Sequence, residues 1–239
     1  TGMLGATFVS FYSARTEHRV VSLARNRADI ECDISDAKAF RLVLDNLKPD
    51  IIINCAALVD INICEQTPTD SWNVNVEPLF TLHEWILSNK CKLIHISTDH
   101  FFDYGGAMPH AERDYVVFKN IYAKHKYCAE QIAKIVSGSL VLRTSIIGER
   151  KYHSDKVVFW EWALDAVMQD KKISLFHDAY TSSMDVLSFC EFTNQLLEKQ
   201  VTGLYNLASS EVYSKKDFVL TLADRLDKKL SAATVGSVK

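Results

Sequence analysis

The chain has 239 residues and a mass of 27.1 kDa, which fits one large α/β domain or a core domain with a small lobe. Hydrophobic residues make up 48% and charged residues 24%, so the chain can bury a sizeable core and does not have the composition of a disordered protein. The formal net charge is −3 and no long basic run occurs. This charge pattern argues against binding of nucleic acid.

Six cysteines are spread along the chain without a C-x-x-C pair. Several lie in apolar runs, where cysteine behaves as a small hydrophobic residue, so the simplest expectation is a reducing, cytoplasmic compartment. No signal-peptide pattern and no apolar run of about eighteen residues occurs, and we expect no membrane association. The chain opens without an initiator Met, which leaves an upstream targeting segment open. The histidines lack metal-binding spacings, so no metal site is predicted.

The first two-thirds of the chain alternate between short apolar runs rich in branched residues and longer amphipathic segments. The predicted strands are residues 20–23, 51–54, 92–97 and 139–143. The predicted helices are residues 36–47, 69–88 and 120–136. Continuously apolar strands linked by helices are typical of βαβ units in a parallel sheet covered on both faces. We therefore predict an α/β, Rossmann-like, doubly wound parallel sheet.

Helical patterns dominate after Arg143. The predicted elements there are helices over residues 155–169, 185–199 and 215–227, with short strands at 173–176 and 204–207. We expect an NAD(P)-binding domain over residues 1–143. A smaller, mainly helical substrate-binding lobe is expected over residues 144–239, partly interleaved with the sheet.

Two glycines three residues apart, Gly2 and Gly5, lie just before an apolar stretch from Ala6 to Tyr12. In a dinucleotide-binding fold, glycines at a strand-to-helix turn let the backbone approach a pyrophosphate, whose charge the helix N-terminus stabilises. The strand that should precede such a turn does not lie within this sequence, and an ordinary turn is the alternative. The predicted cofactor-binding residues of this turn are Gly2, Met3, Leu4 and Gly5.

Arg25 and Arg27 follow the next predicted strand. An acidic residue at this place would bind a ribose 2′-hydroxyl, whereas arginines suit a 2′-phosphate. NADP(H) is therefore favoured over NAD(H), with a solvated, charged loop as the alternative. Asp33 and Ile34 are expected beside the adenine, where Asp33 would accept from the exocyclic amine. Capping of the following helix is the other interpretation of Asp33.

Tyr122 and Lys126 lie four residues apart at the start of a predicted helix and so share one face. A free tyrosine has a pKa of about 10, and a nearby ammonium favours the phenolate, which would suit acid–base catalysis. Thr98 ends the preceding strand, at the edge where open α/β sheets bind ligands, and would polarise a carbonyl oxygen. The alternatives are a surface Tyr–Lys pair and a Thr98 that caps a helix or bonds within a loop.

These motifs together resemble the dTDP-4-dehydrorhamnose reductase family of the extended short-chain dehydrogenase/reductase superfamily. They run in the family's order along nearly the whole chain. The matching segments are residues 1–5, 48–57, 73–75, 96–103, Tyr122 with Lys126, Glu130, 143–145 and 203–207.

The resemblance implies an NAD(P)H-dependent enzyme that reduces a 4-keto group on a nucleotide-linked sugar. Tyr122 would donate the proton to the forming alkoxide, and Lys126 would tune it while holding the nicotinamide ribose. Thr98 would hydrogen-bond the keto oxygen.

The resemblance also implies roles for residues around this centre. Cys55, Ala56 and Ala57 would run beside the cofactor, and Asn75 would steady the adjacent backbone. The implied substrate-binding residues are Thr98, Asp99, His100 and Ile146.

Departures from the family pattern leave the sugar open. Ile146 stands where the family usually has an aromatic residue, Ala123 stands where a glycine follows the catalytic tyrosine, and residues 177–183 differ from the family's Asp-Gln-x-Gly-x-Pro-Thr segment.

An epimerase or dehydratase is one alternative activity, although dehydratases of this superfamily usually carry Asp-Glu after the catalytic threonine, where this chain has Asp99-His100. A cofactor-binding regulatory subunit without turnover, like that of methionine adenosyltransferase, is another. A homodimer is compatible with the sequence.

Overall fold

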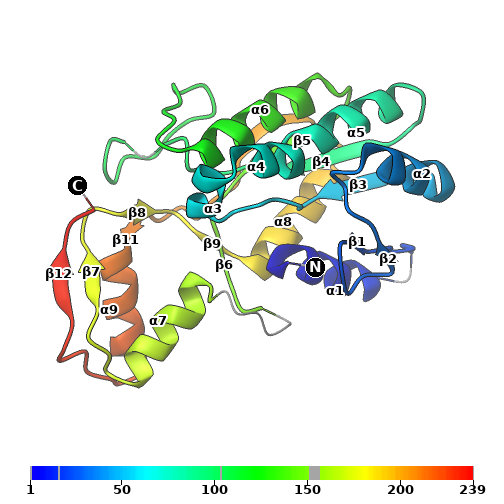
Figure 1. The fold of residues 1–239 in the computed structure, drawn as a ribbon. Helices are drawn as coiled ribbons and strands as arrows, with labels where there is room; N and C mark the ends of the chain where they lie inside the picture. Colours follow the sequence, from blue (N-terminus) through cyan, green and yellow to red (C-terminus); the bar gives the residue numbers. More distant parts are fainter. Residues whose placement is uncertain (1, 16, 103, 151–156, 239) are drawn as a thin grey trace.

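The computed structural model describes residues 2–15, 17–102, 104–150 and 157–238 (Figure 1). Sequence predictions that fall on Thr1, Asp103 and residues 155–156 lie outside the described residues. The helices are α1 (Met3–Ser13), α2 (Ala37–Leu47), α3 (Ile61–Gln66), α4 (Pro68–Asn75), α5 (Glu77–Leu87), α6 (Ile121–Ile135), α7 (Phe159–Met168), α8 (Val186–Glu198) and α9 (Lys215–Arg225). The strands are β1 (Leu23–Ala24), β2 (Ile30–Glu31), β3 (Ile51–Asn54), β4 (Lys92–Ile96), β5 (Leu140–Arg143), β6 (Ile146–Ile147), β7 (Ser174–Phe176), β8 (Tyr180–Thr181), β9 (Met184–Asp185), β10 (Gly203–Asn206), β11 (Tyr213–Ser214) and β12 (Thr234–Gly236).

Four parallel strands form the central sheet in the order β10-β5-β4-β3. All four residues of β5 are buried, as are the last four of β4, because helices cover both faces. Such burial explains why these strands are apolar at every position rather than at alternate ones. The predicted α/β fold with a parallel sheet is confirmed.

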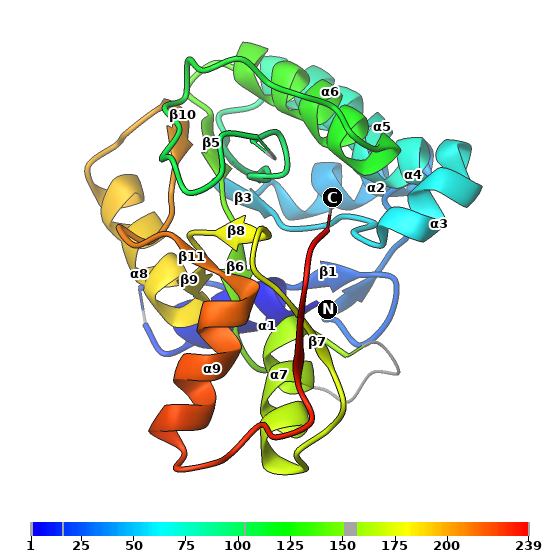
Figure 2. The same cartoon turned by 90° about the vertical axis from the view of Figure 1, so that its left-hand side faces the viewer.

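Two apolar clusters lie on opposite faces of this sheet. On one face, α2, α5 and α6 bury Leu44, Trp85 and Ala133 against Leu93 of β4. On the other face, α1 and α8 bury residues such as Phe8 and Phe189, whose rings meet edge to face. Figures 1 and 2 show this three-layer arrangement, with α5 and α6 above the sheet and α1 and α8 below it. Helix α6, which carries Tyr122, therefore packs with one side against the sheet.

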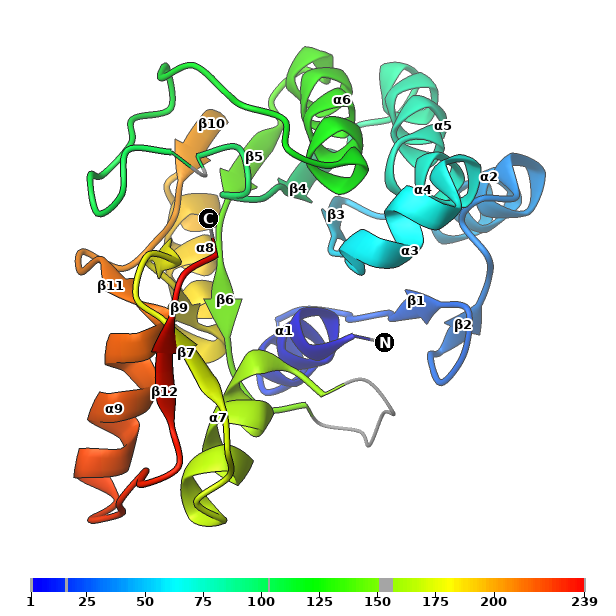
Figure 3. The ribbon, with the colours of Figure 1, turned by 60° about the vertical axis from the view of Figure 1, so that its left-hand side comes forward.

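The C-terminal part of the chain contributes both to this sheet and to a separate lobe. Strand β10 extends the sheet beyond β5, and α8 packs on α1. Helices α7 and α9 with β7 and β12 form the lobe, which lies to one side of the sheet (Figure 3). The lobe has its own apolar cluster, in which Val167, Leu175 and Val219 are almost fully buried.

The predicted single helix over residues 69–88 is wrong, because the segment forms two helices. Helix α4 ends at Asn75, and α5 begins at Glu77 after Val76 takes φ −118° and ψ −54°. Pro78 has no backbone N–H and tolerates only the first turn of a helix, so the first helix cannot continue through it. The break frees the Asn75 side chain to bond elsewhere.

The predicted strand at residues 20–23 is shorter than expected and lies outside the central sheet. Only Leu23 and Ala24 form β1, which pairs in parallel with β2 in a separate two-stranded ladder. Among the described residues, no helix combines the length and apolar character that crossing a membrane requires.

Candidate active site

The carboxyl ends of the parallel strands bring three segments together at one edge of the sheet. Cys55 follows β3 directly, Thr98 is the second residue after β4, and Thr144 follows β5 directly. The Ser97 amide donates to Leu142 O at 2.7 Å, and the Asp99 amide donates to Thr144 O at 3.2 Å, so the ladder continues past the strand ends. Ligands of open α/β sheets bind at this kind of edge.

Tyr122 and Lys126 lie in the first turns of α6 on the face toward the sheet. The helix begins at the N-cap Asn120, whose side chain accepts from the Ala123 amide at 2.7 Å. Tyr122 is 8% exposed and Lys126 is 3% exposed. The Lys126 ammonium donates to Ile96 O at 2.7 Å, which ties α6 to the end of β4. The pair is therefore built into the core edge and is not a surface pair.

Burial controls the protonation of both groups. It raises the pKa of Tyr122 to about 12, although a hydrogen bond with Thr98 lowers that pKa in part and Asp99 raises it further. Burial also lowers the pKa of Lys126 to about 8, against the raising effect of Cys55 and Glu130. The pKa of Tyr122 therefore rises, in contrast to the expectation that Lys126 would favour the phenolate, and burial is the main cause. Tyr122 is a neutral phenol at pH 7.

The loop that begins at Thr98 lies beside the Tyr122 ring. Thr98 is 3% exposed, and its hydroxyl accepts from the His100 amide at 3.2 Å, which is the loop hydrogen bond considered as the alternative role. The His100 ring meets the Tyr122 ring edge on, with centroids 5.6 Å apart. Asp99, which lies between Thr98 and His100 in the sequence, is partly buried. The structure thus brings Thr98, Asp99, His100 and Tyr122 together.

Ile146 lies apart from this group. It forms β6 with Ile147, pairs with Met184 of β9, and packs against the apolar cluster of α1 and α8. Its described packing is with that cluster, on the face of the sheet opposite α6.

The two N-terminal glycines begin α1 beside the loop that follows β3. Gly2 is the N-cap and supplies no side-chain cap, and within the described residues a Cβ at Gly2 would meet no atom within 4 Å. A Cβ at Gly5 would lie 4.0 Å from the Cβ of Cys55. An open backbone and an uncapped helix N-terminus fit a pyrophosphate, so these residues fit a dinucleotide cofactor. Met3 is partly buried and Leu4 is buried beneath them.

Asn75 fixes the backbone beyond Cys55, Ala56 and Ala57. Its Oδ1 accepts from the Leu58 amide at 2.7 Å, and its Nδ2 donates to Leu58 O at 3.1 Å and to Ser71 Oγ at 3.2 Å. Asn75 is 2% exposed. The loop after β3 is therefore clamped at its far end by a buried amide.

The remaining predicted cofactor residues lie around β1 and β2. Arg25 and Arg27 are both exposed just after β1, and Arg27 takes a positive φ of 56°. The Asp33 carboxylate accepts from the Ser35 amide at 3.0 Å and from its hydroxyl at 2.7 Å, which holds the pKa of Asp33 below its usual value. Ile34 is half-buried. The cap of α2 is Asp36 rather than Asp33.

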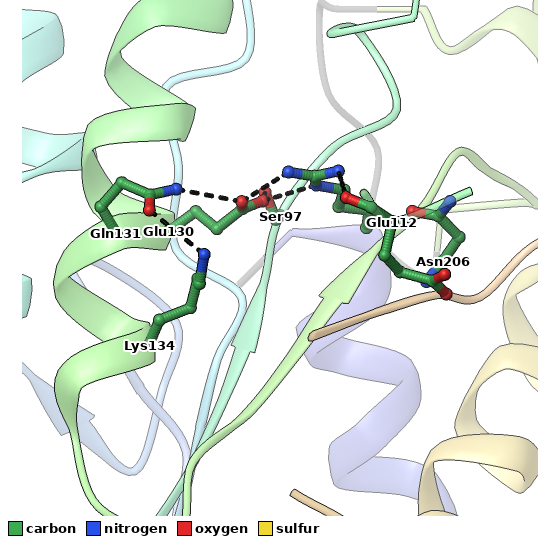
Figure 4. Close-up of polar contacts among 7 residues, drawn as sticks. Ser97, Glu112, Glu130, Gln131, Lys134 and Asn206 are labelled. Carbon is green, nitrogen blue, oxygen red and sulfur yellow. Dashed lines mark hydrogen bonds and ion pairs between the residues drawn. The ribbon is translucent and has the colours of Figure 1, made fainter. Parts of the chain in front are cut away.

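The sequence reasoning assigned no role to a buried ion pair next to the site. Glu130 is 0% exposed and bonds Arg143 of β5 and Ser97 at the end of β4 (Figure 4). Its spacing of four residues from Lys126 was the available signal, because it places both side chains on one helix face.

His95 was expected in the core and is fully buried on β4. The Asn54 side chain reaches its Nδ1 at 3.3 Å, while its Nε2 has no hydrogen-bond partner within the described structure. Burial and the Lys126 charge hold the pKa of His95 well below its usual value, so the ring is neutral. No group of three or more potential metal ligands occurs in the described parts of the chain.

Comparison with known proteins places this arrangement in a family. The family model described as the RmlD substrate binding domain matches residues 1–238. A probable low-salt glycan biosynthesis reductase, Agl14 of Haloferax volcanii, is 27% identical over 91% of this chain and 75% of its own length. A dTDP-4-dehydrorhamnose reductase of Aggregatibacter actinomycetemcomitans is 28% identical over 60% of this chain and 48% of its own length. The methionine adenosyltransferase 2 subunit beta of Danio rerio is 26% identical over 94% and 71%.

Solved structures share the fold. A hypothetical dTDP-4-dehydrorhamnose reductase from Sulfolobus tokodaii aligns with a TM-score of 0.86 and 24% identity over all of this chain and 84% of its own. A dTDP-4-dehydrorhamnose reductase from Bacillus anthracis, in complex with NADP, aligns with a TM-score of 0.83 and 22% identity over 99% and 81%. The family resemblance found in the sequence is confirmed, and the chain belongs to the RmlD substrate binding domain family.

Proposed function

We propose that the chain reduces a 4-keto group on a nucleotide-linked sugar with NADPH. The observation that carries the proposal is the burial of Tyr122 and Thr98 together at the carboxyl edge of the sheet. The reductases among the relatives support it by their names. A bound nicotinamide cofactor would supply the hydride.

Each residue of the site has a distinct part in the proposed reaction. Tyr122 donates its phenolic proton to the oxygen of the former keto group, because a group with a pKa of about 12 holds that proton at pH 7. The Thr98 hydroxyl orients and polarises the same oxygen. Lys126 binds the nicotinamide ribose from its anchored position on Ile96 O. Asp99 and His100 border the sugar.

The cofactor would lie across the segments that follow β1, β2 and β3. The N-terminus of α1, with Gly2, Met3, Leu4 and Gly5, holds the pyrophosphate, and Cys55, Ala56 and Ala57 pass beside the nicotinamide half. NADP(H) is preferred over NAD(H) because Arg25 and Arg27 are exposed where a 2′-phosphate would lie. Asp33 and Ile34 border the adenine. Ile146 stays a predicted substrate-binding residue, and its described packing is with the apolar cluster of α1 and α8.

The six cysteines are free thiols, and none is paired in a disulfide. Cytoplasmic localisation is part of the proposal, since a reducing compartment keeps scattered thiols in this form.

Steady-state oxidation of NADPH with a panel of 4-keto nucleotide sugars tests the proposed activity. We expect turnover of at least one panel member, and a fall of about 10²- to 10⁴-fold for Tyr122→Phe with NADPH binding retained. Tyr127→Phe is the matched control, because Tyr127 lies on the same helix but packs against Phe101 and Phe118. Equal rates for the wild type and Tyr122→Phe would refute the assignment of the proton donor.

A cofactor-binding regulatory subunit is the second candidate. It is favoured by the similarity to the methionine adenosyltransferase subunit, which extends over 94% of the chain. Tight binding of NADPH without oxidation by any panel member would favour this candidate over the reductase.

A further inference from the structure

A buried carboxylate on α6, Glu130, is surrounded by donors from three elements. Arg143 of β5 forks onto it, with Nη2 2.7 Å from Oε1 and Nε 2.8 Å from Oε2. The Ser97 hydroxyl donates to Oε2 at 3.0 Å, and the side chain of Gln131 donates to Oε1 at 3.3 Å. Figure 4 shows Glu130 extending from its helix toward Ser97, with Glu112 on the far side of them from the helix. A buried pair is stable only when its geometry and additional hydrogen bonds are this complete.

The ion pair also fixes the loop that follows the site. Arg143 Nη1 donates to Glu112 O at 3.2 Å, and the Glu112 carboxylate accepts from the Asn206 amide of β10 at 2.8 Å. The guanidinium lies 5.1 Å from the centroid of the Phe101 ring, three residues beyond Thr98. Arg143 thus holds Glu130 from the side away from α6.

Glu130 belongs to the same helix face as the proposed catalytic pair. Tyr122, Lys126 and Glu130 follow one another at intervals of four residues, and all three are buried. Lys126 bonds Ile96 O, while Glu130 bonds the next residue, Ser97. Two bonds from α6 therefore hold the chain immediately before Thr98.

The groups that face Lys126 come from three elements. Cys55 lies after β3, His95 on β4, and Tyr122 and Glu130 on α6. Burial raises the pKa of the Cys55 thiol to about 12 and holds the pKa of His95 far below its usual range, so both are neutral at pH 7. Tyr122 is also neutral. Within this group, Glu130 supplies the negative charge.

We propose that Glu130, held by Arg143 and Ser97, is a positioning residue that keeps Lys126 charged and α6 in register with Thr98. The inference rests on the proposed reductase function for its catalytic consequence. Without the carboxylate, buried Lys126 would lose a negative charge that favours its protonated form and would release its proton at lower pH. A neutral lysine could still donate to Ile96 O but would no longer stabilise negative charge beside Tyr122.

Glu130→Gln tests the proposal, because it keeps the shape and removes the charge. The titration of Lys126 is followed in the cofactor-free protein by NMR of lysine labelled with ¹⁵N, with the signal assigned by Lys126→Arg. The wild-type midpoint lies at about 8. We expect the midpoint to fall measurably below that of the wild type, because the Glu130 carboxylate raises the pKa of Lys126. Glu84→Gln on α5 is the control, because Glu84 is exposed and its loss leaves the midpoint unchanged.

A second variant covers the case in which Glu130→Gln alone fails to fold. Glu130→Gln combined with Arg143→Met removes both buried charges, a replacement that proteins tolerate better than an unpaired ion. Its Lys126 midpoint should fall below that of the wild type but less far than in the single variant. An unchanged midpoint in the folded variants would overturn the proposal.

Enzyme kinetics separate this inference from the proposed function. For an active reductase, the alkaline limb of kcat/KM should move to lower pH in Glu130→Gln by the same amount as the Lys126 midpoint. A purely structural role would instead lower the rate equally at every pH, and that result would refute the electrostatic role. If no 4-keto sugar is turned over, the proposed function fails, while the Lys126 titration still decides the role of Glu130.

Discussion

Replacement of Asn75 by alanine probes the clamp on the loop after β3. The buried side chain accepts from the Leu58 amide at 2.7 Å and donates to Leu58 O at 3.1 Å. In Asn75→Ala the Leu58 amide loses its partner, while Leu58 O keeps the Cys64 thiol as a donor at 3.4 Å. An unsatisfied buried group costs about 1 to 3 kcal/mol, and because one group of the half-buried Leu58 is left without a partner we expect a loss in this range. A domain of this kind has about 5 to 15 kcal/mol of stability, so the variant should fold but be markedly weakened.

Urea denaturation followed by tryptophan fluorescence measures this loss, with Asn46→Ala as the control. Asn46 is exposed on α2, and an alanine there should change the free energy of unfolding by less than about 0.5 kcal/mol. NADPH affinity should also fall in Asn75→Ala, because the loop it clamps is proposed to pass beside the cofactor. A loss below about 1 kcal/mol with an unchanged m-value would mean that water replaces Asn75 at the Leu58 backbone.

Three further changes test separate parts of the structure. The pKa of Lys126 is about 8 in the folded chain against 10.5 for an ordinary lysine, so the unfolded chain binds the proton more readily between these values and stability rises with pH there. Lys126→Met should therefore raise the free energy of unfolding at pH 7 by up to about 3 kcal/mol, less about 1 kcal/mol for the lost bond to Ile96. Urea titrations should show this gain in stability shrinking above pH 8. A gain that does not change with pH would contradict the lowered pKa of Lys126. Arg25→Ala with Arg27→Ala should weaken NADPH binding far more than NADH binding in fluorescence titrations, and equal losses would mean that neither arginine binds the 2′-phosphate. Gly148→Ala should lower the midpoint of thermal unfolding, because its Cβ would lie 2.7 Å from Val186 Cγ1 and overpacking costs about 1 to 3 kcal/mol. An unchanged midpoint would show that the segment after β6 shifts to make room for the methyl group.

Local signals predicted the helix that carries the site almost to the residue. Asn120 is a strong N-cap, and the polar and apolar positions of α6 repeat at helical spacing, so the helix was expected over residues 120–136 and is observed over Ile121–Ile135. The strands β3, β4 and β5 were equally clear because each is a short apolar run between turn residues. Pro78 also indicated the break between α4 and α5, because proline favours the first turn of a helix. The helical periodicity of the surrounding residues nevertheless led to the prediction of a single helix.

Features that depend on contacts between distant segments of the chain could not be predicted from local sequence patterns. Glu130 can accept from both Ser97 and Arg143 only because β4 and β5 lie side by side under α6. The spacing of residues in the sequence does not reveal this strand order. The pKa of Tyr122 was expected to fall because Lys126 is near in sequence. It rises instead, since the degree of burial is set by the sheet, the loop after Thr98 and the rest of α6 acting together.

The burial that raises the pKa of Tyr122 sets the protonation state from which the phenol would act. To donate a proton, Tyr122 must be a phenol, and with a pKa of about 12 it is a phenol throughout the neutral range. To accept one in the reverse reaction it must be a phenolate, which makes up only about one molecule in 10⁵ at pH 7. As the proposed proton donor, Tyr122 therefore holds its proton ready for ketone reduction at neutral pH, whereas the balance between ketone and alcohol depends on the reactants, the cofactor and the pH.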